Sequence, residues 1–359
     1  MAVPFLHLLL LLLLLLFLVP LFLAETTSSP YLSPSTFLPG YQKMLKSFKI
    51  FAYPTPPKDP AALVEASSSA ALFDASLLRS PFLTSDPHRA HLFYLSFPSE
   101  EPRSIARFLR AIRSQYPFWN RTLGADHFFR SIDGLGIESD RNLVELKKNS
   151  IQISPFPTAP GRFVPHKDLT LPSLMFQLAD LPIPSAKPSK FFAFYDGAPR
   201  SPVISPILDE LRRIPDFLIN SWPSNPVSRL GTMSVSRFCL FYYDRDRPRR
   251  DLAIGDALAM GCVPVVISGC PILDLPFSDV LRWTDIALFV GLHGGAGEVR
   301  RAMNRTCGET YERMRVAGGK ASIHFKLSTG PRPFDLFHTV IYQLWLRRHT
   351  IRYRRYNEL

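Results

Sequence analysis

Two neighbouring side chains able to move protons stand out in the stretch YPFWNRTLGADHFF, residues 116–129. Asp126 and His127 provide a carboxylate and an imidazole, two groups that accept protons from hydroxyls in enzymes. Two phenylalanines follow them directly. Because an aromatic run of this kind is typical of a buried strand, we expect the strand to fix the direction in which the pair points.

Residues suited to an anionic ligand lie in the second half of the chain. The segment FFAFYDGAPR, residues 191–200, predicts a strand followed by a turn that contains Gly197 and Arg200. The carboxyl edge of an α/β sheet, beside a helix amino terminus, is a frequent binding place for phosphate groups. The planar guanidinium of Arg200 would hold a diphosphate there, although glycine and arginine also follow strands without such a role.

A basic loop follows the predicted strand at 237–243. It contains Arg249 and Arg250, and a helix that carries Asp256 comes next. Arginines at the carboxyl end of a strand would stabilise a departing diphosphate. A solvated loop would have a similar composition, so both interpretations stay open at this point.

The elements that must position these residues alternate between strands and helices. Helical patterns follow Ser104, cover 298–316 and run from Phe334 to about Arg348. Strands alternating with helices predict parallel sheets covered on both faces, which is the α/β class. The strand candidates span 48–54, 91–97, 151–156, 191–197, 237–243, 262–268 and 285–291.

A proline-containing segment at 178–190 separates two series of strands and helices. Each series has about the length of one domain. We therefore expect two Rossmann-like domains facing a cleft, one at 47–185 and one at 186–350, followed by a basic tail at 351–359.

The amino terminus holds an apolar run from Val3 to Ala24, which is long enough to cross a bilayer as a helix. A cleaved signal peptide has a shorter apolar core, so we expect an uncleaved signal anchor at 1–25. Cleavage is the alternative, because Phe22-Leu23-Ala24 suits a cleavage site. Residues 26–46 are rich in Ser, Thr and Pro and predict a short extended stem. Both alternatives place the remaining chain in the secretory lumen.

Other features bear on the compartment and the partners. Sequons at Asn120 and Asn304 agree with a lumenal location. The four cysteines are too few for a disulfide scaffold, and the absence of a CxxC pair argues against zinc. The net charge of +12 fits acidic polysaccharides, anionic membrane surfaces or phosphate-bearing donors, and also a merely solvated tail. Nucleic acid is not expected, because no recognition motif accompanies the charge.

One triplet has the form of a metal site. Asp244-Arg245-Asp246 ends an apolar strand, as do the metal-binding triplets of some transferases. Its flanking arginines would repel a divalent cation. We therefore expect no metal and no cofactor.

Six segments follow one another as they do in exostosin-type glycosyltransferases, glycosyltransferase family 47, which this chain resembles from roughly Phe48 to Arg348. The resemblance is to the plant members especially, and it implies a single-pass type II Golgi membrane protein of GT-B fold with a lumenal catalytic domain. Such an enzyme transfers a hexosyl or pentosyl group, with inversion, from a nucleotide sugar to a cell-wall polysaccharide or glycoprotein glycan. The segments are YPFWNRTLGADHFF, FFAFYDGAPR, SRFCLFYY, DALAMGCVPVVIS, LPFSDVLRW and PFDLFHTVIYQLWLRR.

The resemblance also implies roles for individual residues. Asp126 and His127 match a Gly-x-Asp-His-Phe segment and are the candidates for the catalytic base or acceptor contact. Gly197 and Arg200 match a family turn on the donor side. Asp256 takes the place of an acidic residue expected to contact the sugar or ribose of the donor, where a carboxylate accepts hydroxyl hydrogen bonds.

Two departures from the family pattern concern the donor pocket. Ala253 stands where the family has an arginine, so a neighbouring Arg249 or Arg250 is expected to supply the charge. Gly269 stands where many relatives have an aspartate, and Asp274 would replace it only if its loop folds back. The alternative function is therefore a catalytically inactive glycosyltransferase-like protein that supports a complex partner or binds acidic glycans.

Overall fold

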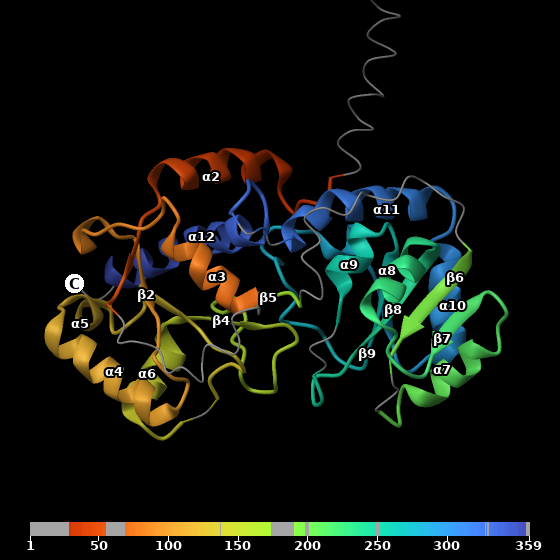
Figure 1. Ribbon diagram of the computed structural model, residues 1–359, viewed down its shortest axis with the longest axis horizontal. Coiled ribbons are helices and arrows are strands. Elements are labelled where there is room, and N and C mark those ends of the chain that lie inside the picture. Colours follow the sequence, from red (N-terminus) through yellow and green to blue (C-terminus); the bar gives the residue numbers. More distant parts are fainter. Residues whose placement is uncertain are drawn as a thin grey trace, which may run out of the picture.

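Two α/β halves lie side by side along the long axis of the molecule (Figure 1). Each half contains a five-stranded sheet in which all strand pairs are parallel. The expected α/β class with two parallel sheets is therefore confirmed. The structure is a computed structural model, and it describes residues 29–54, 69–136, 138–173, 190–197, 201–248, 252–326, 328 and 330–356.

The strands agree well with the apolar runs of the sequence. All seven candidate segments contain a strand, and the aromatic run after Asp126 forms β3. Among the described strands, only β5 and β7, of three and four residues, lacked a candidate. The first sheet has the order β1 (Ile50–Ala52), β2 (Leu92–Leu95), β3 (His127–Arg130), β4 (Ile151–Pro155), β5 (Leu169–Leu171). The second has the order β10 (Leu288–Gly291), β9 (Val263–Ser268), β8 (Ser236–Tyr243), β6 (Phe191–Asp196), β7 (Phe217–Asn220).

In the first sheet the strands lie side by side in the same order as they occur along the chain. Side chains alternate between its faces, so Phe93 and Phe129 pack on one side and Tyr94 and Phe128 on the other. The first side is covered by α4 (Pro102–Gln115), α5 (Phe118–Thr122) and α6 (Arg141–Asn149). The second side therefore needs cover from elsewhere.

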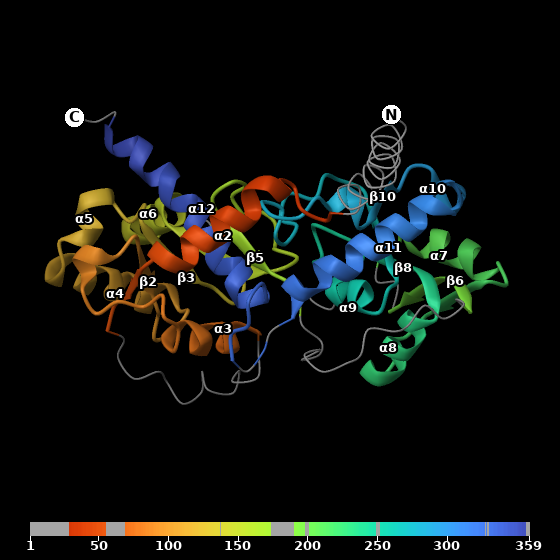
Figure 2. The same ribbon diagram turned by 90° about the horizontal axis from the view of Figure 1, so that it is seen from above.

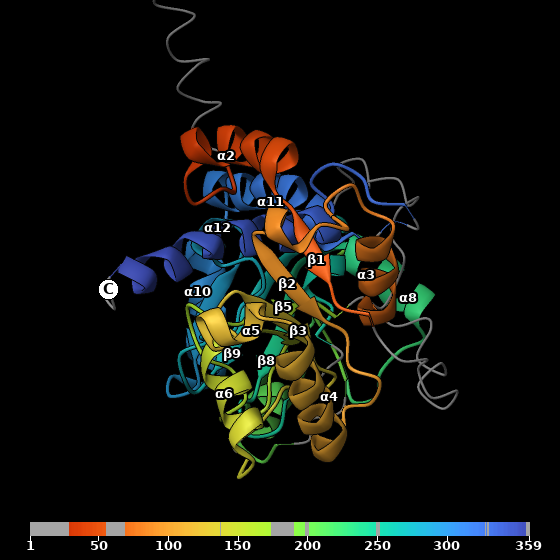
Figure 3. The ribbon, with the colours of Figure 1, turned by 90° about the vertical axis from the view of Figure 1, so that its left-hand side faces the viewer.

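That cover comes from both ends of the chain. The helices α2 (Pro34–Ser47) and α3 (Ser69–Leu78) lie there, together with α12 (Leu336–Tyr356), which returns from the second half (Figures 2 and 3). Val340 and Ile341 of α12 are completely buried in the same core as Tyr94 and Phe128. The two ends of the chain thus complete the first half, and 351–356 of the expected basic tail continue α12.

The position of α2 corrects one expectation. Residues 34–46, which we expected to belong to an extended stem, are helical and packed. Phe37, Tyr41 and Met44 recur at helical spacing and are buried, which outweighs the abundance of Ser and Pro. Proline fits the first turn of a helix, and Pro34 occupies that turn.

The second sheet has helices on both faces and a reversal in its strand order. The predicted helix over 298–316 is in fact two helices, because Gly308, with φ +79°, breaks the chain direction between them. The helices are α7 (Ser205–Arg212), α8 (Pro226–Ser234), α9 (Ile254–Ala259), α10 (Gly295–Arg305) and α11 (Glu309–Ala321). Single turns of 3₁₀ helix occur at Pro87–Arg89 (η2), Trp283–Asp285 (η4) and Ser322–Phe325 (η5).

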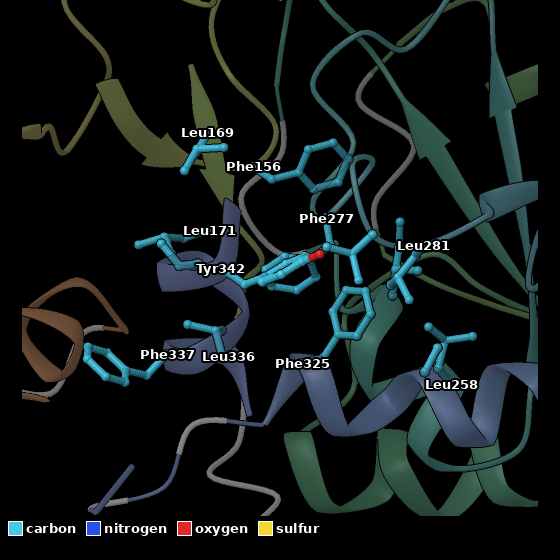
Figure 4. Packing of buried hydrophobic residues seen from close by; sticks show 14 of the residues in the cluster. Phe156, Leu169, Leu171, Leu258, Phe277, Leu281, Phe325, Leu336, Phe337 and Tyr342 are labelled. Carbon is cyan, nitrogen blue, oxygen red and sulfur yellow. The ribbon is translucent and has the colours of Figure 1, made fainter. Parts of the chain in front are cut away.

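The two halves share one hydrophobic core. Phe156 and Leu171 of the first half, Tyr342 of α12, and Phe277 and Phe325 of the second half belong to one cluster of buried side chains (Figure 4). Separating the halves would expose this cluster to water. The free-energy cost would be roughly 25 cal/mol for each Å² of apolar surface exposed. The expected boundary at 178–190 falls largely outside the described residues.

Two structural points concern the compartment and the membrane. A disulfide joins Cys239 of β8 to Cys262 at the start of β9, while Cys270 and Cys307 are free thiols. Among the helices that the structure describes, none is long and apolar enough to cross a bilayer. The anchor expected at 1–25 lies outside these residues.

Replacing Phe37 by alanine tests whether α2 belongs to the folded unit. Phe37 stacks on Tyr31 at 4.4 Å between ring centroids and meets Tyr342 edge-on at 5.2 Å. We expect Phe37→Ala to lower the free energy of unfolding by about 3 kcal/mol. The neighbouring Leu38→Ala, at an exposed site, is expected to change it by less than about 0.5 kcal/mol. Equal effects in denaturant titrations would show that α2 is not packed.

Candidate active site

The reversal of strand order in the second sheet marks a site. From β6 the chain first forms β7 on one side and then crosses to β8 on the other side. A crevice forms at the carboxyl ends of two such strands, and α/β proteins bind ligands there. Asp196 ends β6 and Tyr243 ends β8.

A buried ion pair lies at this switch point. Nε of Arg229, on α8, donates to Oδ2 of Asp196 at 2.5 Å, and both side chains are almost fully buried. Asp196 also accepts hydrogen bonds from Nδ2 of Asn220 at 3.0 Å and from Oγ of Ser224 at 2.8 Å. Burial would raise the pKa of Asp196, but these hydrogen bonds and the charge of Arg229 hold it below the usual value. The network ties the loop between β7 and α8 to the end of β6.

Asp256 lies at the same edge, in the first turn of α9. Asp256 is only 2% exposed, and its Oδ2 has no hydrogen-bond partner among the described residues. Burial raises the pKa of Asp256 to about 7, and the charge of Arg229 only partly opposes this. A buried polar atom without a partner is costly. Asp256 is not among the residues that line the cavity at this edge, so its contact with a donor stays a prediction.

A small cavity of about 20 Å³ opens beside the ion pair. This is room for one water-sized group, so a larger ligand would place only one group here and extend over the sheet edge. Ala253, at the position where the resemblance implies an arginine, lines this cavity together with Arg229. The full lining is Phe194, Tyr195, Asp196, Arg229, Met233, Cys239, Leu240, Phe241, Tyr242, Leu252 and Ala253.

The other donor-side candidates are only partly described. Gly197 follows β6 directly and has φ +147°, which favours glycine because a side chain would be strained there. The structure therefore brings Gly197 and Asp256 to one sheet edge. Arg200, Arg249 and Arg250 lie outside the described residues, and their roles stay predictions.

The acceptor-side pair lies where we did not expect it. Asp126 and His127 are at the amino-terminal end of β3, the end opposite to the carboxyl edge, and both are buried. His127 is enclosed by Tyr53, Phe93 and Trp119, with ring centroids 5.0 to 5.6 Å away. A catalytic base has to reach the acceptor hydroxyl. The geometry thus argues against the expected contact of this pair with an acceptor.

Hydrogen bonds explain what the pair does in the fold. Oδ1 of Asp126 accepts from Nδ1 of His127 at 2.8 Å and from Oγ1 of Thr122 at 2.5 Å, and Nη2 of Arg121 donates to Oδ2 at 2.9 Å. Nε2 of His127 then accepts from the hydroxyl of Tyr53 at 2.9 Å. Burial would raise the pKa of Asp126, but these donors lower it to about 2, while burial lowers the pKa of His127. The pair joins β3, α5 and the end of β1.

A larger cavity that sequence reasoning missed lies at the carboxyl edge of the first sheet. Its volume is about 520 Å³, within the range of small-molecule sites. Glu100 shapes its wall by accepting hydrogen bonds from the Ile132 amide at 2.7 Å and from Oγ of Ser131 at 3.0 Å. The lining residues come from three separate segments: Phe97, Glu100, Pro102, Ile105, Phe129, Arg130, Ser131, Asp133, Gly134, Leu135, Gly136, Glu138, Pro160, Gly161 and Arg162.

Asp274 connects the two sheet edges. Its Oδ2 accepts from the amide and from Oγ1 of Thr158, both at 2.7 Å, and its Oδ1 accepts from the hydroxyl of Tyr243 at 2.8 Å. Thr158 follows β4 and Tyr243 ends β8. The carboxylate therefore joins the two halves. These contacts do not make Asp274 a substitute for the aspartate that the resemblance implies at the position of Gly269.

Three further predicted features can be placed. The carboxylate of Asp244 accepts hydrogen bonds from the amides of Asp246 and Arg247, so it caps its own turn. Within the described residues no group of three His, Cys, Asp or Glu side chains has the arrangement of a metal site. Asn120 on α5 and Asn304 on α10 are both exposed, as glycosylated asparagines must be.

The replacement Asp256→Asn tests the electrostatic state of the donor edge. A carboxyl whose folded-state pKa lies near 7, above the ordinary 3.8, stabilises the fold at low pH and loses this contribution as the pH rises through 7. We expect wild type and Asp256→Asn to be similarly stable at pH 4. At pH 8 the variant is expected to be the more stable, by at most about 4 kcal/mol. A stability difference independent of pH, in denaturant titrations, would contradict the buried carboxyl.

The replacement Asp126→Asn tests the structural role of the acceptor-side pair. It removes the charge that holds His127 and Arg121, and we expect a loss of about 3 kcal/mol at pH 7. The pKa of about 2 means that this contribution is present above pH 4 and declines as the pH falls toward 2. An equally stable variant would return Asp126 to the candidates for a chemical role.

Comparison with known proteins places the chain in a family. A probable glycosyltransferase of Arabidopsis thaliana is 27% identical over 354 residues, covering 90% of this chain and 66% of the relative. A probable beta-1,4-xylosyltransferase of the same plant is 26% identical, covering 67% of each chain. A probable glucuronosyltransferase of Oryza sativa subsp. japonica is 25% identical, covering 67% of this chain and 64% of the relative.

One solved structure gives a weaker likeness. A crystal structure of a glycosyltransferase involved in avilamycin A biosynthesis aligns with 85% of this chain and 98% of its own, at 14% identity and a TM-score of 0.33, too low to carry an argument. The model of the exostosin GT47 domain, in contrast, matches residues 44–293, well over half of the chain. This chain therefore belongs to the exostosin GT47 family of glycosyltransferases.

Proposed function

We propose that this protein is an inverting GT-B glycosyltransferase that moves a sugar from a nucleotide donor to a cell-wall polysaccharide or glycoprotein glycan in the Golgi lumen. Membership of the exostosin GT47 family supports the reaction class. The names of two relatives, a xylosyltransferase and a glucuronosyltransferase, make xylose and glucuronic acid the first donor sugars to examine.

The observation that carries the donor assignment is Oδ2 of Asp256, which has no hydrogen-bond partner among the described residues. It lies at the switch point of the second sheet, where a bound sugar or ribose hydroxyl would donate to it. Gly197, at the end of β6, lets the backbone approach the diphosphate closely. Arg200, Arg249 and Arg250 follow these elements in sequence and are the proposed cations for the leaving group.

The larger cavity at the edge of the first sheet is the proposed acceptor site. Its lining mixes carboxylates and guanidinium groups with Ser131 and glycines, a composition suited to sugar hydroxyls. An inverting transfer needs one base near the acceptor hydroxyl. We place that base among Glu100, Asp133 and Glu138, which line the cavity, rather than at the buried Asp126 and His127.

Several observations support the lumenal, membrane-anchored location. The apolar run from Val3 to Ala24 has the length of a membrane span. The Cys239–Cys262 disulfide is typical of an oxidising compartment. Both sequon asparagines are exposed.

One observation favours the alternative of a non-catalytic family member. Ala253 lines the donor-edge cavity where the family has an arginine, and Nε of Arg229 beside it is used by Asp196. A protein of this kind would keep the fold and the acceptor cavity but bind no nucleotide. It would act by supporting a glycosyltransferase partner.

Nucleotide binding by the full chain in detergent distinguishes the two functions. We expect UDP or GDP to raise the melting temperature, and Asp256→Ala to weaken this binding by about tenfold or more, as the loss of a charged hydrogen bond predicts. Asp209→Ala, an exposed aspartate on α7 of the same half, is the matched control and is expected to bind as wild type does.

Two outcomes would contradict parts of this proposal. A folded wild type that binds neither nucleotide, nor UDP-xylose or UDP-glucuronic acid, would favour the non-catalytic function. Equal binding by Asp256→Ala and Asp209→Ala would remove Asp256 from the donor site while leaving the enzyme assignment intact.

A further inference from the structure

The chain enters the fold at a firmly held point. The amide of Leu32 donates to the Val280 carbonyl at 2.8 Å, and the amide of Arg282 donates to the Pro30 carbonyl at 2.8 Å. The hydroxyl of Tyr31 also lies 3.2 Å from Nε2 of His324. Residues 30–32 are therefore part of the folded body.

The apolar run ends very close to this point in the sequence. Ala24 is its last residue, and Ser29 is the first described residue. Five residue steps span at most about 18 Å when fully extended. If the run is embedded in a bilayer, as proposed above, the folded body cannot stand off from the membrane on a stem.

The helix that follows has apolar side chains on its open side. Leu38 and Leu45 of this helix are 51% and 46% exposed, and Leu32, just before the helix, is 46% exposed, although leucine is usually buried. Leu38 and Leu45 are seven residues apart and therefore lie on the same side of α2. Lys43 and Lys46 of the same helix are exposed as well. We call these five residues the α2 face.

The arrangement of the helices leaves the α2 face open at one edge of the molecule. The buried side of α2 packs on α12, and α2 and α11 together form the upper edge in Figure 1, turned toward the viewer in Figure 2. Residues 30–32, where the chain enters, adjoin this edge through Val280 and Arg282. The point of attachment and the exposed leucines thus belong to the same part of the surface.

We propose that the α2 face rests on the lumenal surface of the membrane that holds the anchor. Leucines enter the boundary between headgroups and acyl chains, and lysines pair with lipid phosphates. A patch of three leucines binds weakly by itself. The short tether makes the contact intramolecular, so even a weak patch stays docked. This inference rests on the proposed anchor.

Docking in this way fixes the orientation of the enzyme. The chain enters beside Val280 in the second half, and α2 then crosses onto the first half. Both halves are therefore held against the bilayer, and neither can rotate freely about the anchor.

Quenching by lipids tests the contact in the full chain. The protein is placed in vesicles of phosphatidylcholine with a minor share of phosphatidylserine, some carrying brominated acyl chains. Leu38→Cys carries a fluorophore, in a background where the free thiols are removed by Cys270→Ser and Cys307→Ser. Val144→Cys on α6, 45% exposed and distant from α2 in Figure 1, is the matched control. We expect about twofold quenching at Leu38→Cys and none at Val144→Cys.

The outcomes separate this inference from the anchor itself. Alkaline carbonate extraction of the same vesicles reports whether the anchor is embedded. Retention in the membrane without quenching at Leu38→Cys would overturn the docking and leave the anchor. Release by carbonate would overturn both. Excimer formation between pyrene labels at Leu38→Cys, without lipid quenching, would show that a second copy covers the face instead, and would also overturn the docking.

Discussion

The structure depends on how the open face of the first sheet is covered. Because this sheet is crossed in sequence order, α4, α5 and α6 all gather on one side. The other side presents Ile50, Tyr94 and Phe128, which must leave water for the half to be stable. The last helix, α12, supplies that cover, and α2 packs on α12 in turn. Both ends of the chain and both halves become one folding unit for this reason.

Among the described residues, two buried carboxylates show how the fold accommodates charge. Asp126 is surrounded by donors and keeps its charge, and Asp196 is paired with Arg229. Asp256 is the contrast, because its Oδ2 has no partner among the described residues. The satisfied groups hold loops in place, whereas Asp256 is the residue that we propose for the donor site.

Much of the fold was predictable from sequence because strands in parallel sheets are continuous apolar runs. The helix α2 was missed because proline and serine masked the spacing of Phe37, Tyr41 and Met44. Asp126 and His127 were misplaced because a motif gives order along the chain but not depth within the fold. The 520 Å³ cavity was invisible because its lining combines residues from 97 to 162, which only tertiary packing brings together.

The dependence of the first sheet on α12 has a consequence for synthesis. The strands of this sheet are complete at Leu171, but the helix that covers them ends at Tyr356. At about 5–20 residues per second, the ribosome needs roughly 10–40 seconds to make the intervening chain. During that time α2 and α3 are the only helices of this face that have been made, among those that the structure describes. The first half can therefore complete its native packing only after translation has produced α12.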